Sequence, residues 1–161
     1  MTETETHVLF WGGPFSNFYE APFQAEGHNF RTSEQYFMWK KAMTFGDEET
    51  AALILAAETP KEAKKLGRKV KGYDDGIWAE KRESIMEEGC YRKYTSNPVL
   101  KKMLLSYPGK EFVEASPYDK IWGIGLGEEE AARKEEKEWP GQNLLGKVLG
   151  RVRDRIKREE A

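Results

Sequence analysis

A helical spacing of apolar residues dominates the chain. Apolar side chains return every three or four positions after Thr32, after Thr59 and, near the end of the chain, after Asn143, and this spacing lines one face of a helix. Thr59 gives the strongest helix start, because a proline follows it and Glu62 stands where a capping box needs an acid. The same kind of pattern predicts further helices from Asp47 to about Ala57, after Asp74 or Asp75, and after Asn97.

Short extended segments lie between these helices. Residues 8–11 read as a buried strand that ends at two glycines and a proline, and residues 22–30 as an extended pair with a turn near Gly27. Residues 112–115 and 121–124 are predicted as two more strands, around a turn at 116–119. Residues 128–138 are so rich in charge that we expect a solvated helix or a mobile excursion with no binding role. The sum predicts an α+β fold, predominantly helical with small β-strand elements.

Length and composition narrow the class of protein. A chain of 161 residues is long enough for one domain with a substantial core, so we expect a single domain, 1–161, with its core at about 8–156. The 26 basic and 28 acidic side chains give a net charge of −2, so the chain lacks the overall positive charge of a duplex-binding protein. No apolar run reaches the roughly 20 residues of a membrane span, and no signal-peptide pattern opens the sequence. A cytoplasmic protein without a membrane partner is the expectation.

Few side chains are available for metal or thiol chemistry. Cys90 is the one cysteine, which excludes an internal disulfide and a cysteine-rich zinc site. It stands at an apolar helical position, so we expect it in the core. His7 and His28 are the two histidines and lie far apart in the sequence without the spacing of metal ligands. The sequence therefore predicts no metal site.

One predicted helix carries charges where a core-facing helix normally has none. Residues 32–42 read TSEQYFMWKKA, and Thr32 with Gln35 three positions later is a capping-box pattern. Positions i, i+3, i+4 and i+7 of a helix share one face, so Glu34 and Lys41 share a face with two large apolar side chains. Such a conflict between local pattern and packing is typical of functional sites.

An acid and an amine on one helix face suit the cleavage of a sugar–nitrogen bond. That bond breaks through an oxocarbenium-like state, which a carboxylate can stabilise or serve with a proton. A lysine whose pKa is depressed by burial can attack the anomeric carbon or trap the opened sugar as a Schiff base. Lys41 lies about 10.5 Å beyond Glu34 along the helix axis, and leans back toward it because helical side chains point to the N-terminus. The alternative is an ordinary lysine that reaches solvent beside Lys40.

Nucleotide-binding loops of the common kinds are missing from the sequence. Gly123, Gly125 and Gly127 form a GxGxG run, but its spacing is not that of the dinucleotide fingerprint, and a charge run follows it instead of an apolar helix. A tight turn or a close approach of backbones is the expected use of these glycines.

Several motifs follow one another in an order that resembles a known family. They are FSNFYEAPF, TSEQYFMWKKA, KEAKKLGR, YDDGIWAEKR, NPVLKKMLL, VEASPYDKIWGIGL and NLLG. The chain resembles the YbiA-like family, also called NADAR, from about Val8 to Ile156. This resemblance implies N-glycosidase activity. One branch of the family resembles enzymes that release ribose 5-phosphate from early aminopyrimidine intermediates of riboflavin synthesis, and another branch removes ADP-ribose from guanine in nucleic acids.

The resemblance also implies roles for particular residues. The family's catalytic positions fall on Glu34, Lys41 and Asp119, and Lys41 matches the lysine proposed to form the Schiff base with ribose. The positions expected at the substrate are Asn17, Arg68, Trp78, Trp122, Gly123 and Asn143. No cofactor is implied.

Without the resemblance, three of these residues have ordinary interpretations. Asp119 reads as a turn residue, Trp78 as a core residue, and Arg68 as an exposed helix residue that could also reach a phosphate. Residues 128–138 precede a Trp-Pro-Gly turn, where loops of the family are expected to vary.

Three hypotheses about function follow. The first is an N-glycosidase with a small ribosyl substrate, a phosphoribosylamino-pyrimidine of riboflavin synthesis. The second keeps the chemistry and changes the substrate to ADP-ribose on guanine, with modified nucleic acid as the partner, although the slightly acidic chain argues against tight binding to a polymer. The third is a module that binds ADP-ribose or NAD without turnover, against which the set Glu34, Lys41 and Asp119 argues.

Overall fold

The computed structural model describes residues 1–161, and contacts within it divide the chain into two compact units. One unit comprises residues 1–16 and 98–161, and the other residues 17–97. Helices account for about half of the chain and strands are few and short, which confirms the predicted α+β class. No helix combines the length and the apolar character needed to cross a membrane.

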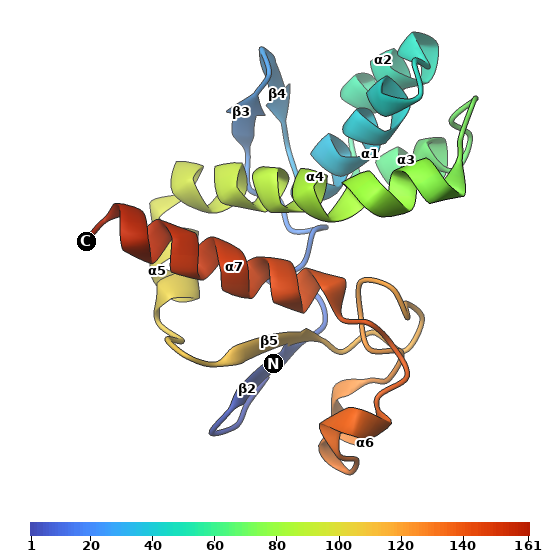
Figure 1. Ribbon diagram of the computed structural model, residues 1–161. Coiled ribbons are helices and arrows are strands. Elements are labelled where there is room, and N and C mark those ends of the chain that lie inside the picture. The colour runs from blue at the N-terminus through green and yellow to red at the C-terminus, as the bar shows by residue number, and fades with distance from the viewer. The chain divides into compact units, whose positions relative to one another are not determined.

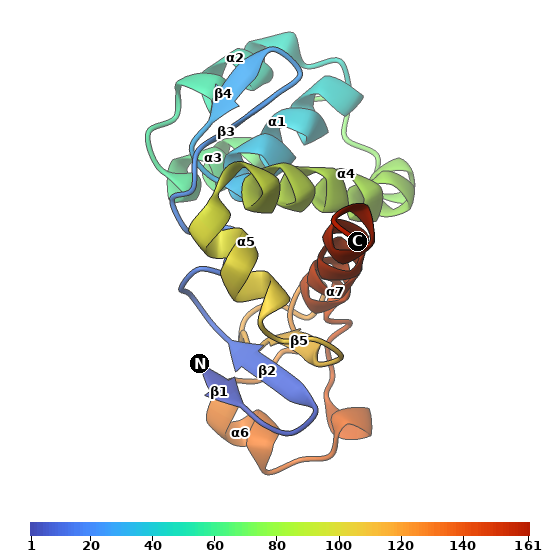
Figure 2. The same cartoon turned by 90° about the vertical axis from the view of Figure 1, so that its left-hand side faces the viewer.

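The unit of residues 17–97 is built around one central helix. α1 (Ser33–Thr44) packs against α2 (Glu48–Ala56), α3 (Pro60–Gly67) and α4 (Asp75–Ser96). A hairpin of β3 (Phe23–Ala25) and β4 (His28–Phe30) adjoins α1 and α4 (Figure 2). Its two-residue turn has positive φ at both positions, 50° at Glu26 and 79° at Gly27, which is the conformation that a tight hairpin requires.

The predicted helix starts of this unit are confirmed by their caps. The Thr32 hydroxyl accepts the backbone N–H of Gln35 at 3.1 Å, and Thr59 accepts that of Glu62 at 3.1 Å. The Asp47 and Asp74 carboxylates cap α2 and α4 in the same way. Each of these side chains satisfies one of the N–H groups that the first turn of a helix leaves without a partner.

The other unit combines a small sheet with the C-terminal helix. Its strand order is β1 (Thr2–Glu3), β2 (His7–Phe10) and β5 (Glu111–Glu114), with β1 antiparallel and β5 parallel to β2. α7 (Leu144–Glu159) packs against β5 and α5 (Pro98–Leu105), as Figure 1 shows. The charged segment after the sheet forms α6 (Glu128–Ala132) and the 3-10 turn η1 (Glu136–Glu138).

Both faces of β2 and β5 are covered. Leu9 and Val113 pack on one face against Ala131 of α6 and Trp139. On the opposite face the ring of Phe112 lies 5.1 Å from that of Phe15, beneath α7. Because side chains alternate along a strand, His7 and Glu111 belong to the face that Leu9 and Val113 occupy. The charged segment therefore covers this face with Ala131, and with Trp139 directly after it, while its acidic side chains stay near solvent.

The predicted strand at 121–124 is wrong. These residues form bends without a ladder partner, because their backbone groups bond to loops. The Ile124 carbonyl accepts the N–H of Gly141 at 2.7 Å, and the Gly123 carbonyl accepts that of Asn143 at 3.0 Å. Gly125 has φ of 77°, which side-chain-bearing residues rarely adopt. Gly125 thus serves a tight turn and Gly123 a close approach, as predicted, whereas Gly127 has an ordinary φ of −73° and open space around it.

Replacing Gly146 with alanine should destabilise the protein by about 1–3 kcal/mol, because overpacking forces backbones apart. A Cβ at Gly146 would collide with the carbonyl oxygen of Phe112 and the side-chain amide of Asn143. Gly150 of the same helix is the matched control, since a Cβ there meets no atom closer than 3.9 Å, so Gly150→Ala should stabilise by about 0.5–1 kcal/mol. Urea unfolding measures both. Equal effects of the two substitutions would contradict the close contact of α7 with β5.

Candidate active site

α1 is buried along most of its length instead of being amphipathic. All residues from Ser33 to Trp39 are buried, since three helices surround α1. Glu34 is only 7% exposed, although a carboxylate is costly to bury without partners. Its backbone N–H donates to the Asn17 carbonyl at 3.1 Å. The helix therefore holds a carboxylate in the interior of this unit.

Lys41 lies two turns further along the same helix, in a half-buried position. Burial lowers the pKa of its amine, and the positive charge of Arg68 lowers it further, while the Glu34 carboxylate opposes the shift. Because interactions of this kind act over short range, Glu34, Lys41 and Arg68 share one environment. The structure thus brings together three of the predicted site residues, and it makes the Lys41 amine easier to deprotonate than an exposed lysine.

Aromatic rings form a wall beside the Lys41 amine. The Nζ atom lies 4.7 Å from the centre of the Tyr73 ring, a cation–π distance when the amine is protonated. Phe45 lies between Tyr73 and Trp78, at 5.4 and 6.3 Å from their ring centres. Trp78 is 5% exposed and packs on Phe37 at 5.0 Å. Tyr73 was missed by the sequence interpretation, because it stands in a loop where no periodicity marks it.

Close packing of two helices carries Arg68 to this environment. A Cβ on Gly67 would collide with the Met38 sulfur, so glycine at position 67 lets α3 lie close to α1 without displacing the Met38 side chain. Arg68 is the C-cap of α3 and is exposed. An exposed guanidinium beside a half-buried amine can hold an anionic group such as a phosphate.

Asn17 organises the start of α1. Its side-chain oxygen accepts the Ser33 hydroxyl at 2.8 Å and lies 3.9 Å from the Cys90 sulfur. Cys90 is 1% exposed, as expected of a core residue, and burial raises the pKa of its thiol to about 12. Asn17 thus positions Glu34 through the backbone, in addition to any contact with substrate that was predicted for it.

Asp119 belongs to the unit of residues 1–16 and 98–161 and forms a tight turn there. Its Oδ1 atom accepts the N–H groups of Ile121 at 2.8 Å and Trp122 at 2.9 Å. This is the turn geometry that aspartate favours. The second carboxylate oxygen, Oδ2, makes no hydrogen bond within the turn, so the residue keeps one oxygen for other chemistry.

The remaining predicted site residues connect elements of the same unit. Asn143 has φ of 54° and directly precedes α7, but its side chain does not cap that helix. It accepts the N–H of Glu114 at 3.0 Å and donates to the Phe112 carbonyl at 2.9 Å. Gly123 is buried, and a Cβ there would lie 2.9 Å from two carbonyl oxygens. Asn143 and Gly123 therefore have structural contacts that account for their presence, and their predicted contact with substrate stays a prediction.

A pocket of about 500 Å³ opens on this unit. It is lined by residues of β5, the loop before α7 and α7 itself, among them Glu111, Glu136, Asn143 and Lys147. Both acidic and basic side chains line it, so it carries no single sign of charge.

Comparison with known proteins assigns the chain to a family. A family model described as the NADAR domain matches residues 9–157. The chain belongs to the NADAR domain family. This match spans residues of both units, and the predicted single domain, 1–161, stays a prediction.

Two relatives and one solved structure are similar to this NADAR chain. N-glycosidase R617 of Acanthamoeba polyphaga mimivirus is 39% identical over 94% of this chain and 97% of that protein. The chloroplastic riboflavin biosynthesis protein PYRR of Zea mays is 30% identical over 89% of this chain, which corresponds to 23% of that protein. The NMR structure of the E. coli protein YbiA superposes with a TM-score of 0.80 at 26% identity, covering 99% of this chain and 89% of that one.

Proposed function

We propose that this NADAR chain is an N-glycosidase that hydrolyses the bond between a base and a ribose or phosphoribose. The name of its mimivirus relative, an N-glycosidase of nearly the same length, supports the reaction class. The observation that carries the proposal is the environment of Lys41: a half-buried amine with a lowered pKa, beside a buried carboxylate and an arginine. A purely structural lysine has no need of that combination.

The residues of α1 supply the chemistry of bond cleavage. As the C1–N bond breaks, the base leaves with its electron pair and takes up a proton, and positive charge develops at C1 of the ribose. The Glu34 carboxylate stabilises that charge. The neutral Lys41 amine attacks C1, and the bond from C1 to the ring oxygen breaks as a proton moves from nitrogen to that oxygen, which leaves a protonated Schiff base between Nζ and C1. Water then hydrolyses the Schiff base, which releases the free sugar and restores the amine.

The neighbours of Lys41 serve binding and protection. Arg68 is suited to hold the phosphate of a phosphoribosyl substrate through paired hydrogen bonds. The aromatic wall of Tyr73, Phe45 and Trp78 covers one side of the amine and offers a flat surface for a sugar or base. No cofactor is needed, since the leaving group, the nucleophile and water complete the reaction.

We further propose that the substrate is a phosphoribosylamino-pyrimidine of riboflavin synthesis, in accord with the name of the maize relative. A second candidate, ADP-ribose on guanine, uses the same chemistry, and the near-neutral charge of the chain suits a nucleotide better than a polymer. Mass spectrometry of released base decides between them when the aminopyrimidine, NAD, ADP-ribose and ADP-ribosylated guanosine are offered side by side. Binding of any of these without a released base would instead favour a non-catalytic module.

The family resemblance makes Asp119 a catalytic position, for which we propose a role in proton transfer, and this role has an isosteric test. Asp119→Asn keeps an oxygen that can accept the two N–H groups of the turn but removes the charge and the basic oxygen. We expect kcat to fall by about 10²–10⁴, the usual contribution of a general acid or base, with an unchanged melting temperature. Steady-state kinetics and thermal melting measure the two. An unchanged kcat would leave Asp119 with a purely structural role in its turn.

The rate should rise with pH as the Lys41 amine loses its proton, at a pH below the ordinary pKa of lysine, because burial lowers that pKa. Replacing Arg68 with glutamine removes a positive charge that lowers it further. The pKa of Lys41 then rises, and the rising limb of kcat/KM against pH moves to higher pH. Arg68→Lys keeps the charge and should leave the limb in place. A rising limb that moves equally in Arg68→Gln and Arg68→Lys would contradict the electrostatic coupling between Arg68 and Lys41.

A further inference from the structure

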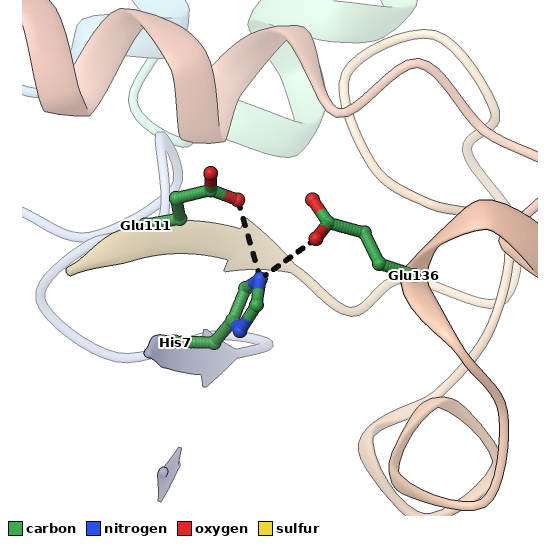
Figure 3. A group of neighbouring side chains, drawn as sticks. All are labelled: His7, Glu111 and Glu136. Carbon is green, nitrogen blue, oxygen red and sulfur yellow. Dashed lines mark ion pairs between the residues drawn. The ribbon is translucent and has the colours of Figure 1, made fainter. Parts of the chain in front are cut away.

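Three side chains from distant parts of the sequence converge in the unit of residues 1–16 and 98–161. The parallel register of β2 and β5 places His7 opposite Glu111, and Glu136 approaches from η1 (Figure 3). The His7 Nε2 atom lies 3.2 Å from the Oε2 atom of Glu111 and 3.3 Å from that of Glu136. The nearest ligand atoms of all three residues lie within 4.8 Å of one another.

Neighbouring residues fix the orientation of the imidazole. The Thr6 hydroxyl lies 2.7 Å from Nδ1, and the Trp139 and imidazole rings form a T-shaped pair, with their centres 5.6 Å apart and their planes at 75°. Trp139 is itself held by a hydrogen bond from its indole N–H to the Ala131 carbonyl at 3.2 Å. When Nδ1–H donates to the hydroxyl, Nε2 carries the lone pair and faces the two carboxylates. A second partner of this kind is typical of histidines that bind metals.

Hydrogen bonding does not account for the contacts of Nε2. The atom is shielded from solvent and makes no hydrogen bond of acceptable geometry, although both carboxylates lie within ion-pair distance. It points between the two carboxylates (Figure 3). A single N–H could donate with good geometry to only one of the two carboxylates, yet both face the same nitrogen at nearly equal distances.

We propose that His7, Glu111 and Glu136 bind a divalent transition metal ion of the zinc class. Two ligand atoms on a tetrahedral zinc ion, with bonds of about 2.0–2.1 Å, lie about 3.4 Å apart, close to the two distances from Nε2. One neutral imidazole and two carboxylates also balance a charge of two. The nitrogen ligand favours zinc, cobalt or nickel over calcium and magnesium, which prefer oxygen ligands alone.

The site is suited to an exchangeable ion that ties the charged segment to the sheet. Three protein ligands leave one position of a tetrahedral ion for water, unlike a closed structural site with four. The Glu111 and Glu136 side chains are 64% and 57% exposed, and both line the pocket of about 500 Å³, which gives an entry path. Bound metal would link β2, β5 and η1. It does not enter the reaction proposed for Lys41, and the two proposals stand or fall separately.

Calorimetric titration of the untagged full chain with ZnCl₂ tests the proposal. We expect one zinc ion per chain, and Co²⁺ in its place should give the visible absorption of a tetrahedral cobalt site. Since loss of even an outer partner of a metal ligand costs about 10–100-fold in affinity, His7→Gln and Glu136→Gln should each weaken binding at least 100-fold and abolish the cobalt spectrum. Metal should raise the melting temperature of the wild type and of neither variant.

Matched controls make the result specific. His28→Gln removes the other histidine of the chain, and Glu135→Gln removes an exposed neighbour of Glu136 that pairs with Lys137; both should bind zinc as the wild type does. Glu136 is an exposed side chain, so its variant tests the site even where His7→Gln fails to fold. Absence of stoichiometric binding by the wild type, or unchanged binding by Glu136→Gln, would overturn the proposal.

Discussion

Replacing Lys41 with methionine should lower turnover by about 10³-fold or more, since loss of a covalent nucleophile commonly costs that much. Methionine keeps the length and apolar stem of the side chain, so the packing of α1 against α2, α3 and α4 should persist. Only the amine is lost, and with it the Schiff base that carries the reaction. Steady-state kinetics of base release, with circular dichroism to confirm the fold, measures the effect.

Lys40 provides the matched control for this substitution. Its ammonium pairs with the Glu26 carboxylate at 3.0 Å and lies 5.9 Å from the centre of the Trp39 ring, away from the environment of Lys41. Lys40→Met should cost no more than about 1 kcal/mol of stability, the usual worth of an exposed ion pair, and should leave kcat unchanged. Equal losses in both variants would show that the effect at Lys41 is structural.

Replacing Glu34 with glutamine should lower kcat by about 10²–10⁴, the range that a positioned carboxylate contributes. The amide has nearly the same shape and fits the same buried space, but it no longer stabilises the positive charge that develops on the sugar. KM should change little, because a carboxylate that acts in the transition state contributes little to binding of the substrate in its ground state. The kinetic constants of the purified variant give both quantities.

The Glu34→Gln variant should also change the pH dependence of the residual activity. The Glu34 carboxylate favours the protonated form of Lys41 and so raises the pKa of that amine. Its removal should lower the pKa of Lys41 and move the rising limb of the residual activity to lower pH, the direction opposite to that expected for Arg68→Gln. A variant with full kcat, or one whose profile does not move, would contradict the shared environment of Glu34 and Lys41.

The elements and residues that local rules govern could be predicted from the sequence. Thr32 and Thr59 cap helices because a hydroxyl satisfies free N–H groups within three residues, a rule that needs no tertiary information. The pairing of Glu34 with Lys41 followed from helical periodicity in the same way. The family resemblance, which the NADAR match confirms, added the reaction class that periodicity could not give.

Features that depend on distant contacts could not be predicted. Residues 121–124 have the composition of a strand, but loop partners such as Gly141 take their backbone groups. Tyr73 reaches Lys41 from a loop, and its position depends on how α3 and α4 pack on α1. His7 meets Glu111 only through the register of two parallel strands about a hundred residues apart. Spacing within the sequence carries no signal for such a group.

Borohydride trapping is a direct test of the Schiff base proposed on Lys41. Sodium borohydride reduces a Schiff base to a stable secondary amine, so substrate and reductant added together should leave a sugar adduct that peptide mass spectrometry can locate. We expect one adduct per chain, on Lys41, formed only with substrate and absent from Lys41→Met. An adduct on a different lysine, or turnover that continues in borohydride with no adduct at all, would contradict it.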